Sequence, residues 1–269
     1  MNKITDNNYT LPLIEALSPH ELFVSGANKP LLITGVDVNG NKGDYVVKFR
    51  SAERMSNEAS MRELLAAFIA GQMEIKAVAP VIVNISQAFV DLLVGNSAWK
   101  YANKSLGLNY GSEYIKGYST IPISQSLNNQ QLKYAQMIFA FDVMIQNPDR
   151  TFNKPNMLTD GNEIVIFDHE LAFGFIFDIF KNSKPWEIRS PDLEWINKHC
   201  LLQKINGSAF DFDEFSQRFD NLGERFWDTA WNLIPPEWRS DQFNIIKQHL
   251  SAICENKNGF ILELKKLMS

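Results

Sequence analysis

The segment from residue 147 to residue 170 constrains the fold of this chain more than any other. It begins Asn-Pro-Asp-Arg-Thr-Phe-Asn-Lys-Pro-Asn-Met-Leu and ends Ile-Val-Ile-Phe-Asp-His-Glu. An Asp-Gly pair at 160–161 separates two short apolar runs, which is typical of a β-hairpin. We therefore predict strands at 156–158 and 164–167, joined by this turn.

Three polar side chains come together if this hairpin forms. Asn156 begins the first strand, Asp168 directly follows the second, and Asp149 lies just upstream. Phosphoryl transfer needs this set, because one carboxylate orients the nucleophilic hydroxyl while a carboxamide and a second carboxylate hold Mg²⁺ against the nucleotide phosphates. The sequence thus predicts Asp149 as the catalytic residue and the other two as metal ligands. Taken singly, Asp149 is also common turn chemistry, and Asp168 an ordinary acid at a strand end.

The two motifs resemble the catalytic and metal-binding loops of the HipA-like kinases, a bacterial branch of the protein-kinase-like fold related in outline to phosphoinositide kinases. Ordinary protein kinases have His-Arg-Asp in the catalytic loop and Asp-Phe-Gly in the metal loop. This chain has Asn-Pro-Asp, seven residues from Asp149 to Asn156, and Asp-His-Glu at 168–170. The resemblance implies an α+β, two-lobed protein-kinase-like fold that uses ATP and Mg²⁺. Its small N-lobe, mainly β with one long helix, would span 1–116, and its mainly helical C-lobe 117–269.

Other polar residues of the catalytic loop are secondary candidates. Asn156 directly precedes an apolar strand, whereas Asn153 is followed by Lys-Pro, so Asn153 is expected to brace the loop. Arg150 is expected to form an ion pair within the loop, with a phosphate contact as the alternative. His169 is expected to pack, because no other histidine lies nearby in the sequence.

A lysine in the amino-terminal third completes the pattern. Strands are predicted at 31–38 and 44–49 with an Asn-Gly turn between them, and Lys48 lies within the second strand. The string Val-Val-Lys-Phe resembles the Val-Ala-Ile-Lys strand of kinases, whose lysine holds the α- and β-phosphates. The alternative is a lysine at one end of a solvated face. Because a helix and then the acidic set follow in the kinase order, we predict that Lys48 binds nucleotide.

In this family a phosphate-covering loop lies upstream of the strand lysine. In this chain its place is taken by a segment that includes Ser25, Gly26 and Lys29. Small residues let backbone N–H groups approach phosphate oxygens, and Lys29 adds charge. The loop has fewer glycines than the Gly-rich loop of ordinary kinases. A plain turn closed by Pro30 is therefore the alternative interpretation.

The segment from 54 to 74 predicts the long helix. A kinase needs a glutamate here to pair with its strand lysine. Glu58 lies on the apolar stripe, whereas Glu63 lies among small residues that permit close approach to a sheet. The family layout, an apolar helix before a valine-proline strand, favours Glu63 as the partner of Lys48, with Glu58 second. The stripe expected to be buried, by its i, i+3, i+4, i+7 spacing, comprises Met61, Leu64, Leu65, Phe68, Ile69 and Gln72.

Tyr110–Tyr114 resembles the segment that links the two lobes in this family, which implies that main-chain groups at Glu113 and Tyr114 meet adenine. The six tryptophans are expected to pack in the core and at its edges rather than to stack nucleic-acid bases. Apolar patterning and helix-start signals predict the remaining elements. These are strands at 78–85 and 106–118, helices at 87–94 and 127–146, and helix starts at 190–192 and 234–238.

Composition narrows the cellular role. The chain carries a formal charge of −5 with a pI near 5.5, so no basic field favours nucleic acid or an anionic membrane as a partner. No apolar run approaches the roughly 20 residues that span a bilayer, and the polar N-terminus lacks a secretory signal. Cys200 and Cys254 have no metal-type spacing and are expected to be reduced, partly buried thiols in helices. We therefore expect a cytoplasmic enzyme of bacterial type.

Three functions remain open. The first is an ATP- and Mg²⁺-dependent kinase that phosphorylates Ser or Thr of a protein. The second is a nucleotide-binding pseudokinase that serves as a scaffold. The third is a kinase for a lipid or small molecule, suggested by the Asp149-Arg150 similarity to phosphoinositide kinases. An active kinase is favoured, because no member of the catalytic set is missing. HipA-like relatives include toxin kinases of toxin–antitoxin pairs, which implies an antitoxin-like or regulatory protein partner.

Overall fold

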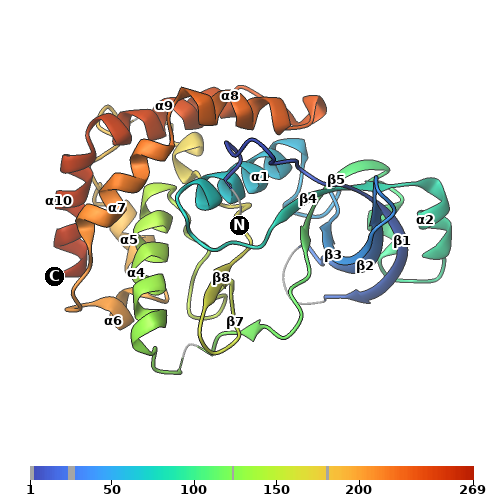
Figure 1. Cartoon of the computed structure of the whole chain (residues 1–269), viewed down its shortest axis with the longest axis horizontal. Helices are drawn as coiled ribbons and strands as arrows, with labels where there is room; N and C mark the ends of the chain where they lie inside the picture. Colours follow the sequence, from blue (N-terminus) through green and yellow to red (C-terminus); the bar gives the residue numbers. More distant parts are fainter. Residues whose placement is uncertain (1–2, 24–27, 123, 180–181) are drawn as a thin grey trace.

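The computed structural model describes residues 3–23, 28–122, 124–179 and 182–269, and it is a mixed α+β structure. The amino-terminal part contains the strands β1 (Leu13–Leu22), β2 (Leu31–Asp37), β3 (Lys42–Lys48), β4 (Pro80–Ile85) and β5 (Gly107–Glu113). They close into a barrel in the order β1-β2-β3-β5-β4 (Figure 1). Neighbouring strands are antiparallel except β1 and β4, which run parallel.

Strand β1 is the barrel strand that the sequence did not predict. Ile14 and Glu15 pair with both β2 and β4, but the second half of the strand pairs with β2 alone. The register to β2 shifts before Ser18 and again after Pro19, and a proline has no N–H to donate to a ladder. These irregularities hide the strand from a search for period-two alternation. The other four strands were predicted, and the largest difference is that β5 ends at Glu113.

Helix α1 (Asn57–Gln72) runs between the barrel and the carboxy-terminal helices (Figure 1). Ser56 caps it, because the serine side chain accepts a hydrogen bond from the Ala59 N–H at 3.1 Å. Every residue from Ala59 to Gln72 is buried, so the expectation of a single buried stripe was wrong. The helix contacts β5 and also α8 (Glu224–Leu233), and a helix covered on several sides buries its whole circumference.

The predicted hairpin is present. Strands β7 (Met157–Thr159) and β8 (Ile164–Ile166) are antiparallel, and β6 (Ser119–Thr120) pairs with the other edge of β7. The segment before β4 lies beside this hairpin, since the Val78 N–H donates to the Ile166 carbonyl at 3.0 Å. The segment that leads into β4 is thereby joined to the last residue of β8.

No helix within the described ranges is long and apolar enough to cross a bilayer.

Helices make up most of the carboxy-terminal part. The remaining helices are α2 (Gln87–Leu92), α3 (Trp99–Ala102), α4 (Asn129–Met144), α5 (Asp192–Ile196), α6 (Leu202–Ile205), α7 (Phe212–Arg218), α9 (Gln242–Glu255) and α10 (Lys257–Met268), with 3₁₀ helices η1 (Gly174–Phe177), η2 (Phe219–Asn221) and η3 (Pro236–Trp238).

Two local predictions in this part need correction. The segment 234–238 was expected to start a helix, but it forms only η3. The residue before a proline is pushed towards extended backbone, and Ile234 and Pro235 are indeed extended, with ψ of 125° and 133°. Cys200 lies in a turn after α5 rather than in a helix, although both it and Cys254 are free thiols as expected.

Candidate active site

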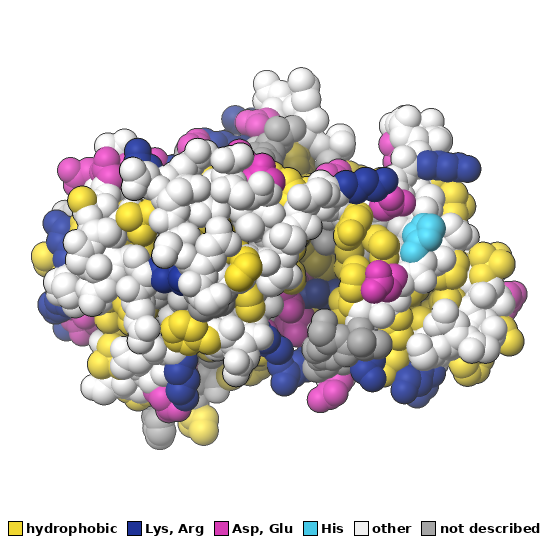
Figure 2. Space-filling model, turned by 90° about the horizontal axis from the view of Figure 1, so that it is seen from below, with side chains coloured by type: hydrophobic (Ala, Val, Ile, Leu, Met, Phe, Trp, Pro, Cys, Tyr) yellow, Lys and Arg dark blue, Asp and Glu magenta, His cyan; other side chains and the backbone are white. Residues whose placement is uncertain are grey.

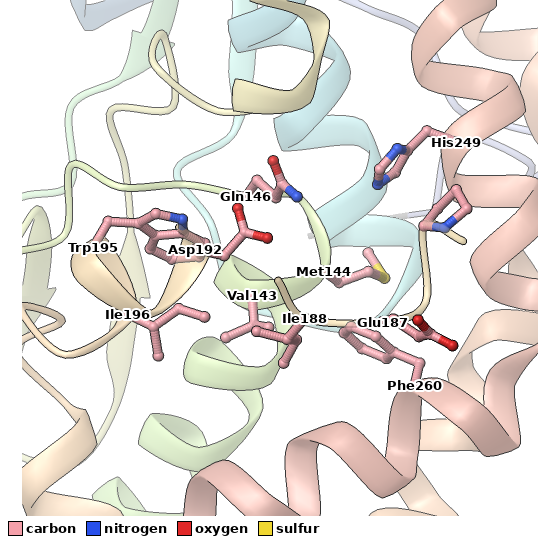
Figure 3. A pocket seen from close by; sticks show the side chains of 11 residues that line it. Val143, Met144, Gln146, Glu187, Ile188, Asp192, Trp195, Ile196, His249 and Phe260 are labelled. Carbon is pink, nitrogen blue, oxygen red and sulfur yellow. The ribbon is translucent and has the colours of Figure 1, made fainter. Parts of the chain in front are cut away.

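A cavity of about 410 Å³ opens between the barrel and the β7–β8 hairpin. Val46, Tyr110 and Leu158 contribute to its wall, and Lys48 and Asp168 give it a charged region. Figure 2 shows the surface hollowed between the two parts of the molecule, with basic and acidic side chains together in the hollow. A second pocket, among α4, α5, α9 and α10, measures about 10 Å³ (Figure 3), which leaves room for about one water molecule. The larger cavity is therefore the candidate active site.

Lys48 is the centre of an ion cluster in this cavity. Its Nζ lies 3.0 Å from Glu63 of α1. Two more carboxylates, Asp168 at 2.5 Å and Glu170 at 2.9 Å, reach it from the loop after β8. Glu63 is also held from its other side, because its second carboxylate oxygen accepts a hydrogen bond from the His169 N–H at 3.0 Å. One lysine thus joins the barrel, the long helix and the hairpin loop.

Burial and mutual charge shift the pKa values of this Lys48 cluster. Burial opposes the charge on Lys48, but the carboxylates, Asp168 first, outweigh it and raise the pKa of the lysine well above its ordinary value. Burial likewise opposes the charge on Asp168, yet Lys48 holds the pKa of that carboxyl well below its usual range. Burial raises the pKa of Glu63 and raises that of Glu170 to about 8. Three carboxyl groups facing one ammonium leave the cluster formally short of positive charge.

Asn156 and Asp168 flank the hairpin in left-handed backbone conformations, with φ of 47° and 64°. Asn and Asp adopt this region more readily than other non-glycine residues. The Phe167 N–H donates to the Asn156 carbonyl at 3.2 Å, which joins the two ends of the hairpin. The amide of Asn156 and the carboxylate of Asp168 consequently lie on the same cavity wall. Unusual backbone of this kind clusters at functional sites.

Asp149 lies behind Asn156 rather than among the residues that line the cavity. The Asn156 Nδ2 donates to the Asp149 carbonyl at 3.3 Å and to its carboxylate at 3.4 Å. The Nζ of Lys154 lies 3.7 Å from the same carboxylate. Burial raises the pKa of Asp149, with Lys154 opposing the shift. A carboxylate of this kind, beside the cavity and partly shielded from water, is suited to orient a hydroxyl.

The sequence suggested that Arg150 forms an ion pair within its own loop, but the structure shows no such ion pair among the described residues. Its side chain is fully buried, and its Nε donates to Asp142 of α4 at 2.5 Å. A second bond, from Nη1 to the Asn156 carbonyl at 2.5 Å, fixes the end of the catalytic loop. His199, from the turn after α5, lies 3.0 Å from the same aspartate. Because this arginine faces away from the cavity, a phosphate contact for Arg150 is excluded by its burial.

The match to a family decides what kind of protein this is. The family described as HipA-like kinase matches residues 23–258. The chain belongs to the HipA-like kinase family. The resemblance found in the sequence motifs is thereby confirmed. Among curated proteins, no significant match is found.

Solved structures add more distant likenesses to this HipA-like kinase. The chain is similar to a Helicobacter pylori proinflammatory kinase, CtkA, at 13% identity, with 93% of this chain and 95% of that chain covered and a TM-score of 0.44. It is also similar to CtTel1 in an open conformation, at 13% identity over 90% of this chain and 11% of that chain, with a TM-score of 0.32. A third similar structure is the FAT and kinase domain of CtTel1, at 14% identity over 90% of this chain and 20% of that chain, with a TM-score of 0.31. None of these likenesses transfers a residue role to this chain.

The two residues expected near adenine in this kinase do line the cavity, but their main-chain N–H groups already have hydrogen-bond partners. Glu113 and Tyr114 are both part of its wall. The Glu113 N–H already donates to the Ala79 carbonyl at 2.9 Å, and the Tyr114 N–H to the Asp44 carbonyl at 3.0 Å. At these two positions, carbonyl oxygens are therefore the main-chain groups left for a ligand.

Part of the segment expected to cover the phosphates borders the cavity. Ser25 and Gly26 lie outside the described residues. Lys29 is described, with a positive φ of 42°, but it is not among the residues that line the cavity, whereas its neighbours Asn28 and Pro30 are. Asn153 of the catalytic loop does line the cavity.

The second candidate on the helix does not reach Lys48. Glu58 lies in the first turn of α1, where it is exposed and accepts a hydrogen bond from the Ser56 hydroxyl at 2.8 Å. Glu63, one and a half turns further along, is 1% exposed. The helical wheel placed Glu58 on the apolar stripe, but α1 is buried on all faces only from Ala59 onwards, and its first turn is not.

Three ionic residues of this HipA-like kinase were missed by the sequence reasoning. Glu170 lies two positions after Asp168, and its nearness in the sequence to that expected metal ligand was the signal that could have found it. Asp142 and His199 gave no local signal, because they meet only when α4 and the turn after α5 pack together.

Proposed function

We propose that this chain is a two-lobed kinase that transfers the γ-phosphate of ATP, with Mg²⁺, to a Ser or Thr hydroxyl of a protein. The observation that carries the proposal is the convergence of Lys48, Asn156 and Asp168 on one cavity wall, from β3 and from the two ends of the hairpin. The lobes would be residues 1–116 and 117–269. The cavity would then be the cleft between them.

The cavity suits a nucleotide in size and in chemistry. Its volume of about 410 Å³ falls in the range of roughly 300–1,000 Å³ that is usual for small-molecule sites. Val46, Val78 and Leu158 offer apolar surface for a base, while Lys48 and Asp168 form the charged region. Lys48 would hold phosphate oxygens, and Glu63 would keep the lysine in place.

The donor set fits Mg²⁺. An amide oxygen from Asn156 and a carboxylate from Asp168 are the hard oxygen ligands that this ion prefers. The ion would supply charge neutralisation at the phosphates. Asp149, adjacent to Asn156, would orient the acceptor hydroxyl and receive its proton. Since these residues act by position and charge, their geometry matters more than any covalent chemistry.

The acceptor of the phosphate can be identified directly. Incubating the purified chain with γ-labelled ATP, Mg²⁺ and a bacterial cell extract would identify it. Label on protein bands, lost after treatment with a Ser/Thr phosphatase, supports a protein kinase, and a co-purifying target would be the antitoxin-like or regulatory partner. Label in the lipid or small-molecule fraction alone would replace the protein acceptor.

Nucleotide binding can be tested without knowing the acceptor. ATP with Mg²⁺ should raise the midpoint of thermal unfolding, because a ligand that binds only the folded state stabilises it, by about 2.7 kcal/mol at one hundred times Kd. ATP without metal should raise it less. No shift at millimolar nucleotide would refute the proposed function. Binding with no transfer to any acceptor would indicate a pseudokinase.

A further inference from the structure

The ammonium of Lys48 has no hydrogen-bond donor left for a ligand. An ammonium has three donors, and the carboxylates of Glu63, Asp168 and Glu170 lie 2.5 to 3.0 Å from it. A phosphate oxygen can therefore bind Lys48 only if one of these carboxylates moves to another partner. The three carboxylates differ in how firmly other groups hold them.

Glu170 is the carboxylate that has to leave. The proposed role of Lys48, contact with two phosphates, requires two free donors. Asp168 frees one donor when it turns to Mg²⁺, whereas Glu63 stays, because the His169 N–H holds it from its other side at 3.0 Å. The second donor must come from Glu170, whose carboxylate has Lys48 as its sole hydrogen-bond donor among the described residues. Burial also raises the pKa of Glu170, so its charge is poorly stabilised at this position.

Arg62 of α1 is a buried cation beside Glu170. The residue is 8% exposed, its Nε donates to the Glu170 main-chain carbonyl at 3.4 Å, and its Nη1 donates to the Gln242 side chain at 2.8 Å. The guanidinium lies 5.3 Å from the centre of the Phe177 ring. In the described ranges no carboxylate lies within ion-pair distance of Arg62, and its Nη2 forms no hydrogen bond.

A buried guanidinium without an ionic partner is unfavourable, because the cost of removing its charge from water is not repaid. Burial accordingly lowers the pKa of Arg62, although acidic neighbours beyond ion-pair distance, Glu58 first and then Glu170, oppose the shift. The guanidinium nevertheless remains charged. Arg62 can therefore accept one carboxylate with a gain in stability, and Glu170 is the acidic residue whose main chain it already contacts.

We propose that Arg62 is a positioning residue that receives the Glu170 carboxylate when a nucleotide phosphate takes the place of that carboxylate on Lys48. The inference rests on the proposed function, in which Lys48 binds phosphate. Because the guanidinium already contacts the main chain of Glu170, a change of side-chain rotamer at Glu170 is enough to bring the two charges together. The exchange frees a donor of Lys48 without leaving a buried carboxylate unpaired.

A double-mutant cycle between Arg62 and Glu170 tests the exchange. Calorimetry measures the affinity for ATP with Mg²⁺ in the wild-type chain, Arg62→Gln, Glu170→Gln and the double variant. Arg62→Lys keeps the cation, and Arg218→Gln is the matched control. Arg218 also holds α1, because its Nη1 donates to the Met73 carbonyl at 2.8 Å, but it does so at the carboxyl end of the helix, beyond Glu63. Circular dichroism verifies that each variant is folded.

Arg62→Gln should weaken ATP binding by about tenfold, the usual worth of one charge-assisted contact, because Glu170 then has no cation to move to. Glu170→Gln should bind ATP at least as tightly as the wild type. The double variant should equal Glu170→Gln within about twofold, since no charge at position 170 is left for Arg62 to receive. Arg62→Lys should retain most of the affinity, and Arg218→Gln should equal the wild type.

A double variant that binds ATP as weakly as Arg62→Gln overturns the inference, because Arg62 would then act independently of Glu170. Weaker ATP binding in Glu170→Gln, or the same loss in Arg218→Gln as in Arg62→Gln, also overturns it while the proposed function stands. A wild-type chain that binds no ATP overturns both.

Discussion

Two ionic clusters within the described part of this molecule are built on opposite plans. In the Lys48 cluster, three carboxyl groups surround one ammonium at the wall of a cavity. In the second cluster, which we call the Arg150 cluster, Arg150 and Asp142 form a matched pair, with His199 and the Asn156 carbonyl as further partners. The matched cluster is sealed from water, with both charged side chains 0% exposed.

The difference separates a structural role from a functional one. A buried pair survives only when its charges match and its hydrogen bonds are satisfied, since desolvation is costly. An acidic surplus beside a cavity has no such balance, and perturbed carboxyl groups in a cleft are typical of functional sites. The clusters are also connected, because Arg150 holds the carbonyl of Asn156, whose side chain faces the cavity. The Arg150 cluster therefore holds Asn156 in position at the cavity that contains the Lys48 cluster.

The largest effect is expected from breaking the matched cluster. Arg150→Ala leaves Asp142 buried without its partner, which should cost about 3–5 kcal/mol of folding stability. Urea unfolding would measure the loss. Lys198→Met serves as control, because Lys198 forms an exposed pair with Glu194 at 2.8 Å, and such a pair contributes about 0–1 kcal/mol. A loss below about 1 kcal/mol in Arg150→Ala would mean that this cluster does not hold the fold together.

Next come the two aspartates of the cavity region, whose roles should separate. Asp149→Asn should lower phosphate transfer by at least about a hundredfold, since it removes the proton acceptor, and leave nucleotide affinity nearly intact. Asp168→Asn should weaken Mg²⁺-nucleotide binding itself, because a metal ligand and a charge are lost. Calorimetry and labelled-phosphate assays would distinguish them. Interchangeable behaviour of the two variants in binding would refute the assignment of roles.

A smaller effect should follow from Glu63→Gln. The amide keeps a neutral acceptor for the His169 N–H but loses the ion pair with Lys48, so we expect transfer to fall by about tenfold. Glu58→Gln should be close to wild type, since Glu58 is exposed and bonded to Ser56. Steady-state kinetics at saturating ATP would compare them. An inactive Glu58→Gln beside an active Glu63→Gln would place the functional pairing elsewhere on α1.

The smallest effect is a difference in pH dependence between the clusters. Arg150 and His199 outweigh burial and hold the pKa of Asp142 below its ordinary value. Its stabilisation is therefore complete above the unfolded pKa near 4 and is lost as the pH falls, by about 1 kcal/mol between pH 5 and pH 3. Burial raises the pKa of Glu170 to about 8, so its contribution is present below about pH 4.5 and is lost as the pH rises towards 8.

Urea unfolding across this range would compare the wild type with Asp142→Asn and Glu170→Gln. The wild type should lose its advantage over Asp142→Asn on acidification, and it should lose stability relative to Glu170→Gln as the pH rises from 5 to 8. If the free energy of unfolding changes with pH in the same way in all three proteins, neither carboxyl group has the shifted pKa that its cluster is expected to produce.

The sequence by itself determined the parts of this protein that depend on neighbouring residues. Two short apolar runs and the Asp-Gly turn between them predicted the hairpin, and the hairpin predicted that Asn156 and Asp168 lie together. The strand that carries Lys48 followed from the same signals. In each case the interaction that decides the structure acts over a few residues, so it leaves a local pattern.

Only the tertiary structure decided which distant segments meet. Asp142 and His199 are 57 positions apart, and Lys48 and Glu170 are 122 apart. Contacts of that span leave no period in the sequence, because they arise from packing of whole elements. Packing of the same kind encloses α1 on several sides, and a wheel drawn for one buried face misjudged Glu58. Local patterns determine the elements of this kinase, and their packing determines which charges meet.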